Sequence, residues 1–539
     1  MPKITVNEID NSRYVSPSKS APMVVLVPGT ASFGPVFTAN SPAVSTFVGE
    51  DALADFYNMY GINPAYVAGE TGVLSSVEGD LSFEYATNLL KSGATIHFYR
   101  LNEGKTAQNT DGTIVAKYSG RFGNHLAVQI DKVKSTDKDV VISIFRTNGS
   151  LEYTSNYDAN KIDTTKLIAL SKTRVSVDVN SSYFADVVDL KFVKISSESL
   201  STLMAKMGDK DSIVEFLFGG LDFGTETEPD SPMTNVKSAL VDSYTSFVDP
   251  YLYDFDFVVS GGIVLSDKDN EAIHTAMKNI CCTRKDCEAI LDTPLTFTHS
   301  EVVEYAAKEE FNTSYCAFYA PWATITSSTT GKNFIAPPSL VFLKAILHGM
   351  QSQTESELWY VPAGVSRASA PFIVKPEYEI GSVILDEFQN NNPYRVNPIM
   401  KLRNYGYCIY GNATALHAEP GLPHSALESM NVRLISNVIK KYIFEVCSGL
   451  SFDYNNSTLW LKFYSQMDEK LLYMKRHYGL YDYKIQMDSS TVTAQAQNER
   501  RVPGKILISP TLAGEYFDID FEIAPSGVSF TSEGGIINE

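Results

Sequence analysis

The sequence predicts a multidomain protein of the α/β and α+β classes, in which an α/β core carries a mostly β inserted domain. Three observations predict it. Apolar strand-like runs alternate with helical segments in residues 21–115 and again in 201–430, an order typical of α/β layers. Strand-like sequence dominates 116–200, and two helical stretches followed by strands fill 431–524. At 539 residues, 44% of them hydrophobic, the chain can form two to four domains with separate cores.

The first residues are predicted to form an extended arm. Residues 1–20 carry isolated apolar side chains at Ile4, Val6 and Ile9, and Ser16-Pro17-Ser18 breaks the segment. An arm that cannot bury itself is either disordered or pairs with a partner.

Apolar runs closed by turn residues predict the first strands of the core. We expect strands at 23–27, closed by Pro28-Gly29, and at 94–100, with helices over 45–60 and 82–91 between them. This strand–helix–helix–strand order predicts an α/β layer.

The inserted domain is expected to be built from hairpins. An Asn148-Gly149 turn, the favoured pair for a tight hairpin, separates predicted strands at 140–146 and 151–154. Further strands are predicted at 174–179 and 187–195.

The segment 201–430 returns to alternating strands and helices. Pro337-Pro338-Ser339 is expected to open a helix, because the missing N–H of proline would be an orphan in a first turn anyway. The predicted strands are 255–259, 287–291 and 315–319, and the predicted helices are 268–279, 299–310 and 340–348.

The C-terminal part, 431–524, is predicted to be a compact unit of two helices and three strands. Apolar side chains repeat at helical spacing up to Gly449, and Asn456-Ser457 can cap a second helix. Strands are expected at 481–487, 505–509 and 516–523, and a tail over 525–539 carries Val528 and Phe530.

Charge excludes several classes of partner. The formal net charge is -19, so direct binding to nucleic acid and to anionic membrane surfaces is disfavoured. The sequence shows no signal peptide and no apolar run near the ~20 residues of a membrane helix. We therefore expect a soluble protein made in a cytoplasm, with no membrane insertion.

No motif points to catalysis, a cofactor or a metal. Phosphate-binding loops, nucleophile elbows and zinc-binding helices are missing from the sequence. Asp256, His299 and Ser366 supply the residue types of a hydrolase triad, but a triad is defined by geometry. The cysteines at 281, 282 and 287 lack the usual zinc spacing, and structural thiols are favoured over a metal site. We expect no catalytic, cofactor-binding or metal-binding residues.

One segment departs from the acidic background. Residues 431–487 contain eight basic and five acidic side chains, a net charge of +3. The segment is either a pair of solvated helix faces or an attachment surface. Six of its cations are candidates for such a surface: Arg433, Lys440, Lys441, Lys470, Lys475 and Arg476.

Several motifs occur in an order that resembles contractile tail sheath proteins of phages and phage-tail-like bacteriocins. The strand at 315–322 fits the pattern Y-x-A-x-Y-x-P-W and precedes a P-P-S helix start. Gly406, Gly411 and Thr414 fit G-x-x-x-x-G-x-x-T after a V-N-P segment, although Ala413 stands where arginine is frequent. The E-I-D arm at 8–10 and the G-x-x-x-x-G-P turn at 29–35 also match, as does G-x-F-G-N at 120–124, with Phe122 in place of tryptophan.

The resemblance implies a structural subunit and not an enzyme. Such subunits polymerise helically as stacked six-membered rings around a tail tube and contract to drive the tube through a bacterial envelope. The implied partners are other copies of the chain, the tube protein, and baseplate and tail terminator proteins. The implied location is a virion tail assembled in the cytoplasm of the host bacterium.

The resemblance also implies roles for particular residues. The arms would add strands to sheets of neighbouring subunits, through segments marked by Ile4, Val6, Ile9, Val528 and Phe530. The six C-terminal cations would face the tube. Two alternatives stay open: an α/β hydrolase-like enzyme with a β insertion, and a non-contractile structural protein of a virion or secretion system.

Overall fold

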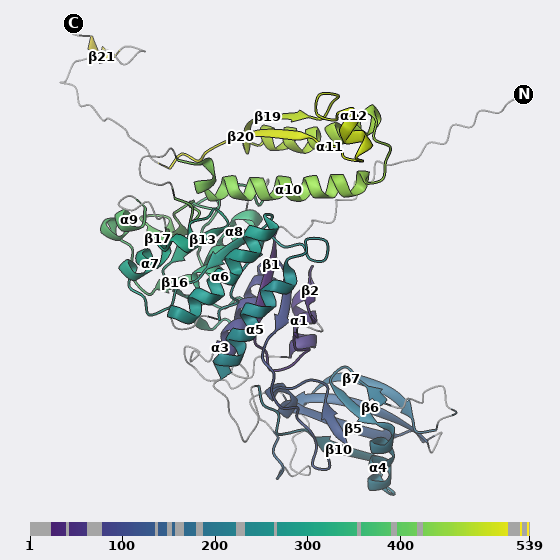
Figure 1. Ribbon diagram of the computed structural model, residues 1–539. Helices are drawn as coiled ribbons and strands as arrows, with labels where there is room; N and C mark the ends of the chain where they lie inside the picture. The colour runs from purple at the N-terminus through teal and green to yellow at the C-terminus, as the bar shows by residue number, and fades with distance from the viewer. Residues whose placement is uncertain are drawn as a thin grey trace, which may run out of the picture.

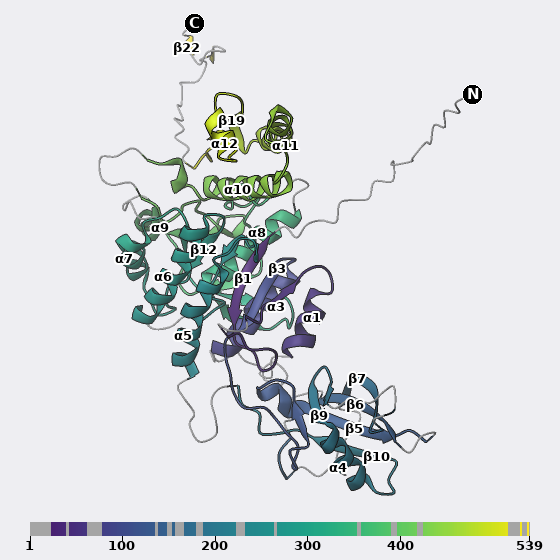
Figure 2. The ribbon, with the colours of Figure 1, turned by 45° about the vertical axis from the view of Figure 1, so that its right-hand side comes forward.

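A computed structural model shows three regions arranged in a row, with an α/β core in the middle (Figure 1). A β-rich unit and a C-terminal helical unit lie at opposite ends of the core in both views (Figures 1 and 2). The structure describes residues 23–38, 42–61, 78–134, 138–147, 153–156, 167–178, 180, 187–222, 232–263, 267–352, 357–389, 396–417, 424–515, 529–530 and 536–537. The mixed α and β composition predicted for the chain is confirmed.

The core is an eight-stranded sheet of order β18-β17-β13-β12-β11-β1-β3-β2. The strands from β3 to β17 run parallel, and an antiparallel strand closes each edge. The strands are β1 (Val24–Gly29), β2 (Ser45–Phe47), β3 (Thr95–Arg100), β11 (Phe257–Val258), β12 (Glu288–Leu291), β13 (Cys316–Ala320), β17 (Asn397–Leu402) and β18 (Gly406–Ile409). The central strands are buried on both faces, as the continuous apolar runs of the sequence predict.

Helices cover both faces of this sheet. One face packs against α1 (Ala52–Tyr60), α3 (Glu78–Lys91) and α8 (Pro338–Ser352). The other packs against α5 (Pro232–Tyr244), α6 (Asp267–Arg284), α7 (His299–Ala306) and α9 (Ser382–Gln389). A small antiparallel sheet joins β14 (Ala323–Thr326) to β15 (Asn333–Ala336) and β16 (Ile373–Pro376). Among the described helices, none combines the length and the apolar content that a bilayer span requires.

The helix predicted over 45–60 is wrong in its first part. Ser45–Phe47 is the edge strand β2, which pairs antiparallel with β3. Gly49 follows with φ of 87°, a left-handed conformation that ends the strand before α1 begins at Ala52. Pairing along the edge of the sheet therefore overrides the helical spacing of these residues.

The β-rich unit contains two antiparallel sheets and one helix. The four-stranded sheet has the order β10-β5-β6-β7, and the three-stranded sheet has the order β4-β9-β8. The elements are β4 (Ile114–Ala116), β5 (Leu126–Lys132), β6 (Asp139–Thr147), β7 (Leu167–Ser176), β8 (Val187–Asp189), β9 (Val193–Ser196), α4 (Ser197–Met207) and β10 (Ser212–Phe216).

Two predictions for this unit need correction. The predicted hairpin between 140–146 and 151–154 is wrong, because β6 pairs with β5 on one edge and with β7 on the other. Tyr153 and Thr154 lie outside any strand. The proposed end of the unit at residue 200 is also too early, because β10 belongs to the same sheet as β5.

The C-terminal unit stacks two helices on a two-stranded sheet. It consists of α10 (Met430–Leu450), α11 (Ser457–Arg476), β19 (Leu480–Gln486), α12 (Ala494–Asn498) and β20 (Lys505–Pro510). As predicted, the Asn456 side chain caps α11 by accepting hydrogen bonds from the backbone N–H groups of Thr458 and Leu459. The predicted strand at 516–523 lies outside the described residues.

Candidate functional site: the seam between α10 and the sheet

The C-terminal unit meets the core along α10. In Figure 1, α10 lies across the top of the core, at the edge where the parallel strands begin. Because β11, β12 and β13 are parallel, the segments that precede them all reach this edge. We call the contact of α10 with residues 253–256, 284–287 and 314–315 the α10 seam.

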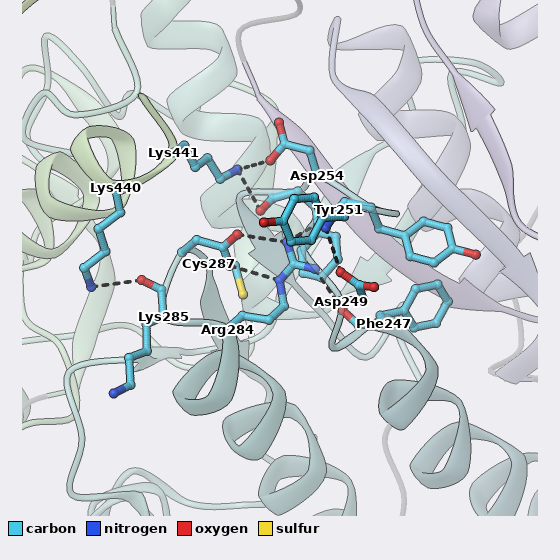
Figure 3. Close-up of polar contacts among 12 residues, drawn as sticks. Phe247, Asp249, Tyr251, Asp254, Arg284, Lys285, Cys287, Lys440 and Lys441 are labelled. Atoms are coloured by element: carbon cyan, nitrogen blue, oxygen red, sulfur yellow. Dashed lines mark hydrogen bonds and ion pairs between the residues drawn. The ribbon is translucent and has the colours of Figure 1, made fainter. Parts of the chain in front are cut away.

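Lys441 forms ion pairs with two carboxylates of the core at the α10 seam (Figure 3). Its ammonium group lies 2.7 Å from a carboxylate oxygen of Asp254 and 2.6 Å from one of Asp256, and it donates to the carbonyl of Phe255 at 2.8 Å. Burial alone would lower the pKa of Lys441, but the two carboxylates outweigh it and raise that pKa. The Asp256 carboxylate also accepts the N–H of Val24, which ties the start of β1 to α10.

Lys440 and Arg433 contact the segments that directly precede the neighbouring strands. Lys440 donates to the carbonyl of Lys285 at 2.9 Å and to the Tyr315 hydroxyl at 3.0 Å. Burial, followed by the nearby charges of Arg433 and Lys285, lowers the pKa of Lys440 to about 8. The Arg433 guanidinium lies 4.0 Å above the Tyr315 ring and donates to Ser314. These two cations therefore attach α10 to the segments that lead into β12 and β13.

The seam is incompletely packed. A cavity of about 600 Å³ opens between the two units. Arg284, whose side chain is fully buried, forms its core-side wall and binds Asp286 and the carbonyls of Phe247 and Tyr253. Tyr251, which is 77% exposed, contacts Phe444 of α10 at the outer end of the seam. Charged side chains from both units line the cavity: Asp254, Asp256, Asp286, Lys285, Lys440, Lys441, Glu445 and Lys470.

These contacts narrow the prediction of a cationic attachment surface. Arg433 is only 3% exposed and stacks on Tyr315, so it cannot face a partner in this arrangement. Lys440 and Lys441 are engaged with the core. The three remaining candidates lie on α11: Lys470 over the rings of Tyr442 and Tyr473, Lys475 paired with Asp482 at 2.7 Å, and Arg476 beside His477. For these three the prediction stays a prediction.

Sequence reasoning missed the acidic partners in the core. Asp254 and Asp256 flank Phe255 directly before a buried strand. Two signals in the sequence could have indicated this contact. Acidic residues stand where a parallel strand begins, and the helix over 431–449 carries cations seven and eight positions apart on one face. The arm residues Ile4, Val6, Ile9 and Val528 lie outside the described residues; Phe530 lies in the short strand β21 (Ser529–Phe530), which pairs with β22 (Ile536–Ile537).

The residue types of the hydrolase hypothesis are engaged elsewhere. Asp256 binds Lys441, and His299 binds Glu387 at 2.6 Å. Within the described ranges, no group of three or more histidine, cysteine or acidic side chains is arranged to hold a metal ion. Cys281 and Cys287 are buried with their sulfurs 3.5 Å apart. Burial raises the pKa of Cys281, which disfavours the thiolate that a metal requires.

This burial predicts selective thiol labelling. Cys447 is exposed, whereas Cys281, Cys287, Cys316 and Cys408 are buried. In the native protein a maleimide should label Cys447 first, and the buried thiols should react only after denaturation. Mass spectrometry of tryptic peptides measures this order. Rapid native labelling of Cys281 would show that the core is open at this point.

A second buried polar cluster lies at the carboxyl ends of the parallel strands, on the side of the sheet away from α10. Ser339, in the first turn of α8, donates its backbone N–H at 2.7 Å and its hydroxyl at 2.5 Å to the Asp292 carboxylate. The Tyr85 hydroxyl lies 2.9 Å from the Ser339 hydroxyl. Burial raises the pKa of Asp292 to about 6, although the hydrogen bonds from Ser339 oppose the rise. The P-P-S motif thus anchors α8 to the end of β12.

The chain has relatives by sequence and by fold. No known protein-family profile matches it. It is 21% identical over 394 residues to the tail sheath protein of Enterobacteria phage T4, covering 68% of this chain and 55% of that protein. It is also 21% identical over 175 residues to the tail sheath protein of Vibrio phage KVP40, covering 32% of this chain and 25% of that protein. The chain thus spans about half or less of the length of these curated relatives.

Solved structures share the fold. The sheath tail protein of Desulfitobacterium hafniense matches with a TM-score of 0.52 and 12% identity, over 90% of this chain and 94% of that one. The sheath tail protein Lin1278 of Listeria innocua matches with a TM-score of 0.52 and 12% identity, over 87% and 90% of the two chains. The chain is thus similar in sequence to two phage tail sheath proteins and shares the fold of two solved sheath tail proteins.

Proposed function

We propose that the protein is the structural subunit of a contractile tail sheath, polymerising helically around a tail tube. The observation that carries this proposal is the sequence likeness to two phage tail sheath proteins on a fold that is shared over nearly the whole chain. A further structural relative, with a TM-score of 0.51, comes from a six-fold symmetrised baseplate of the anti-feeding prophage. It supports stacked six-membered rings and baseplate contact for this chain.

The proposed mechanism is a change of packing without a chemical reaction. Heterologous contacts that do not close on themselves generate a helical polymer. The extended polymer is a high-energy state held kinetically, and a signal from the baseplate releases it. The subunits then repack ring by ring and drive the tube through the bacterial envelope. The sheath would be assembled in the host cytoplasm and end as part of the virion tail, with the tail terminator as a further partner.

Strand addition by the arms is supported by the C-terminal sheet. Within the described residues, β19 and β20 form a two-stranded antiparallel sheet, so each strand has an outer edge with unpaired backbone groups. An arm from a neighbouring subunit could pair there through backbone hydrogen bonds, which do not require one exact packing of side chains. We assign this role to the segments around Ile4, Val6 and Ile9 and around Val528 and Phe530.

Contact with the tube is proposed for the cations of α11. Lys470, Lys475 and Arg476 lie on the helix that packs on the far side of α10 from the core (Figure 1). Lys475 and Arg476 are exposed, whereas Lys470 is half-buried and also lines the cavity of the α10 seam. Exposed cations of this kind would set the register and the rate of association with the tube, and the contact would be sensitive to salt. This assignment replaces the broader set of six cations.

Negative-stain microscopy of the purified protein, alone and with its cognate tube protein, tests the function. We expect long hollow striated cylinders, wider and shorter in pitch without the tube. Dispersed particles under every condition would contradict the polymer.

A matched pair of variants tests the arm within the same experiment. Ile4→Asp with Val6→Asp should abolish the cylinders, because a charge on the buried side of an added strand stays unpaired. Thr5→Asp with Asn7→Asp adds the same charge on the alternate side and should leave assembly intact. Equal loss or equal retention in the two variants would contradict strand addition by this arm.

A further inference from the structure

The part of α10 that faces the sheet is polar where a helix of a packed core is ordinarily apolar. Arg433, Asn437, Lys440 and Lys441 recur at spacings of three, four and eight along the helix and therefore share one face. The contacts of the three cations with the core, described above, place this face against the sheet. Asn437, between them, is 4% exposed.

Several buried polar atoms at the α10 seam or directly next to it lack a hydrogen-bond partner among the described residues. They are Nε of Arg433, both amide atoms of Asn437, and both carboxylate oxygens of Glu288, the first residue of β12. Burial raises the pKa of Glu288, although the charges of Arg433 and Lys440 oppose the rise. Each unpaired buried group disfavours the closed seam, because water would satisfy it.

The main apolar contacts between the two units lie at the N-terminal end of this polar stretch of α10. The C-terminal unit has its own apolar core, formed by α10, α11 and β19. Met430 and Leu434, in the first turns of α10, instead belong to the core of the large sheet. Leu358 packs against that same core, and the adjacent Trp359 is buried in the C-terminal unit. The units are therefore joined by buried apolar contacts at these two places. Along the rest of α10 they are joined by charged groups, a cavity and the exposed Tyr251–Phe444 contact.

We propose that the α10 seam is a latch that opens, with α10 and the C-terminal unit pivoting about Met430 and Leu434. In the closed state, which the structure shows, Lys441 is held by Asp254 and Asp256. In the open state, water enters the cavity and solvates Glu288, Asn437 and the released ions. Two partners of a desolvated ion pair regain hydration when they separate, so opening costs far less than separating an apolar face of similar area.

Conditions that weaken ion pairs should therefore favour the open state. The hinge lies inside one chain and does not depend on what the chain assembles with. A subunit with such a hinge has two arrangements of its C-terminal unit available without unfolding either core.

Distance measurement by pulsed electron spin resonance tests the latch. Spin labels are placed at Leu461→Cys on α11 and Val383→Cys on α9, which are 67% and 71% exposed. The accessible native thiols are removed by Cys447→Ser and Cys282→Ser. Labelled chains are diluted in unlabelled protein so that only distances within one chain are read.

Lys441→Glu places a third acid beside Asp254 and Asp256 and should open the seam. We expect one narrow distance in the parent protein and a second, longer population in the variant, a rise of about tenfold in the open fraction. Lys462→Glu is the matched control. It reverses the charge of a lysine that forms an ion pair of similar length, 2.8 Å from Asp453, but inside the C-terminal unit. This control should keep the parent distance.

Measuring the same distance at high salt concentration is a second test, and it needs no substitution at the seam. Raising the salt concentration from about 0.1 M to about 1 M shortens the screening length from about 10 Å to about 3 Å and should enlarge the longer population in the parent protein. An unchanged distance in both Lys441→Glu and high salt would overturn the latch. An equal shift in the Lys462→Glu control would also overturn it.

Discussion

Replacing Gly349 by alanine should lower the free energy of unfolding by about 1–3 kcal/mol, the usual cost of overpacking a close contact. Gly349 lies in α8, and a Cβ there would stand 1.8 Å from the carbonyl oxygen of Arg367. Because that neighbour is backbone, either α8 or the segment around Arg367 must move. The segment also pairs with β18, since Ile409 donates to the carbonyl of Ala368, so the strain would reach the sheet.

The same substitution at Gly449 is the matched control. Gly449 lies in α10 with no atom within 4 Å of a Cβ built on it. Alanine there should raise the free energy of unfolding by roughly 0.5–1 kcal/mol, because glycine loses more backbone entropy in a helix. Urea unfolding followed by circular dichroism compares the two variants. A Gly349→Ala protein as stable as Gly449→Ala would show that α8 is not in close contact with residue 367.

Stability should fall as pH rises through 6, because of Asp292. Burial raises the pKa of this carboxyl from 3.8 to about 6 in the folded protein. The folded state thus holds the proton more tightly than the unfolded state. The stabilisation is complete below about pH 4 and is lost between about pH 4 and pH 6, a total near 3 kcal/mol at about 1.4 kcal/mol per unit.

Asp292→Asn should remove this part of the pH dependence. The amide can still accept the N–H of Ser339 and donate to its hydroxyl, so the anchor of α8 is largely retained. The measurement is the free energy of unfolding of both proteins between pH 4 and pH 7. Asp482→Asn, at an exposed acid paired with Lys475, should keep the parent slope. Parallel pH profiles of Asp292→Asn and the parent would refute the raised pKa.

The α10 seam changes how the basic C-terminal segment is interpreted. Its net positive charge suggested one outward attachment surface. In the structure, half of the candidate cations, Arg433, Lys440 and Lys441, hold the C-terminal unit to the core. The partners were hidden because Asp254 lies nearly two hundred positions earlier in the chain. A count of charges along a segment does not distinguish a cation that faces solvent from one that faces a distant acid.

The class of fold, most of the buried elements and the resemblance to contractile tail sheath proteins follow from the sequence alone. Long apolar periodicities identified α8, α10 and α11, and continuous apolar runs identified β1, β3, β12 and β13, because these patterns depend only on local spacing. The ordered motifs around Tyr315 and Gly406 carry the resemblance to contractile tail sheath proteins.

The pairing of the strands and the partners of the charged side chains are set only in the folded chain. Strand β6 pairs with β5 on one side and with β7 on the other, so no edge is left for residues 151–154, which were predicted to pair with it. Ser45–Phe47 becomes a strand because β3 offers it an edge. Lys441 meets Asp256 because α10 crosses the sheet where β11 begins. Each of these outcomes depends on contacts between residues far apart in the chain, which the local spacing of residues cannot predict.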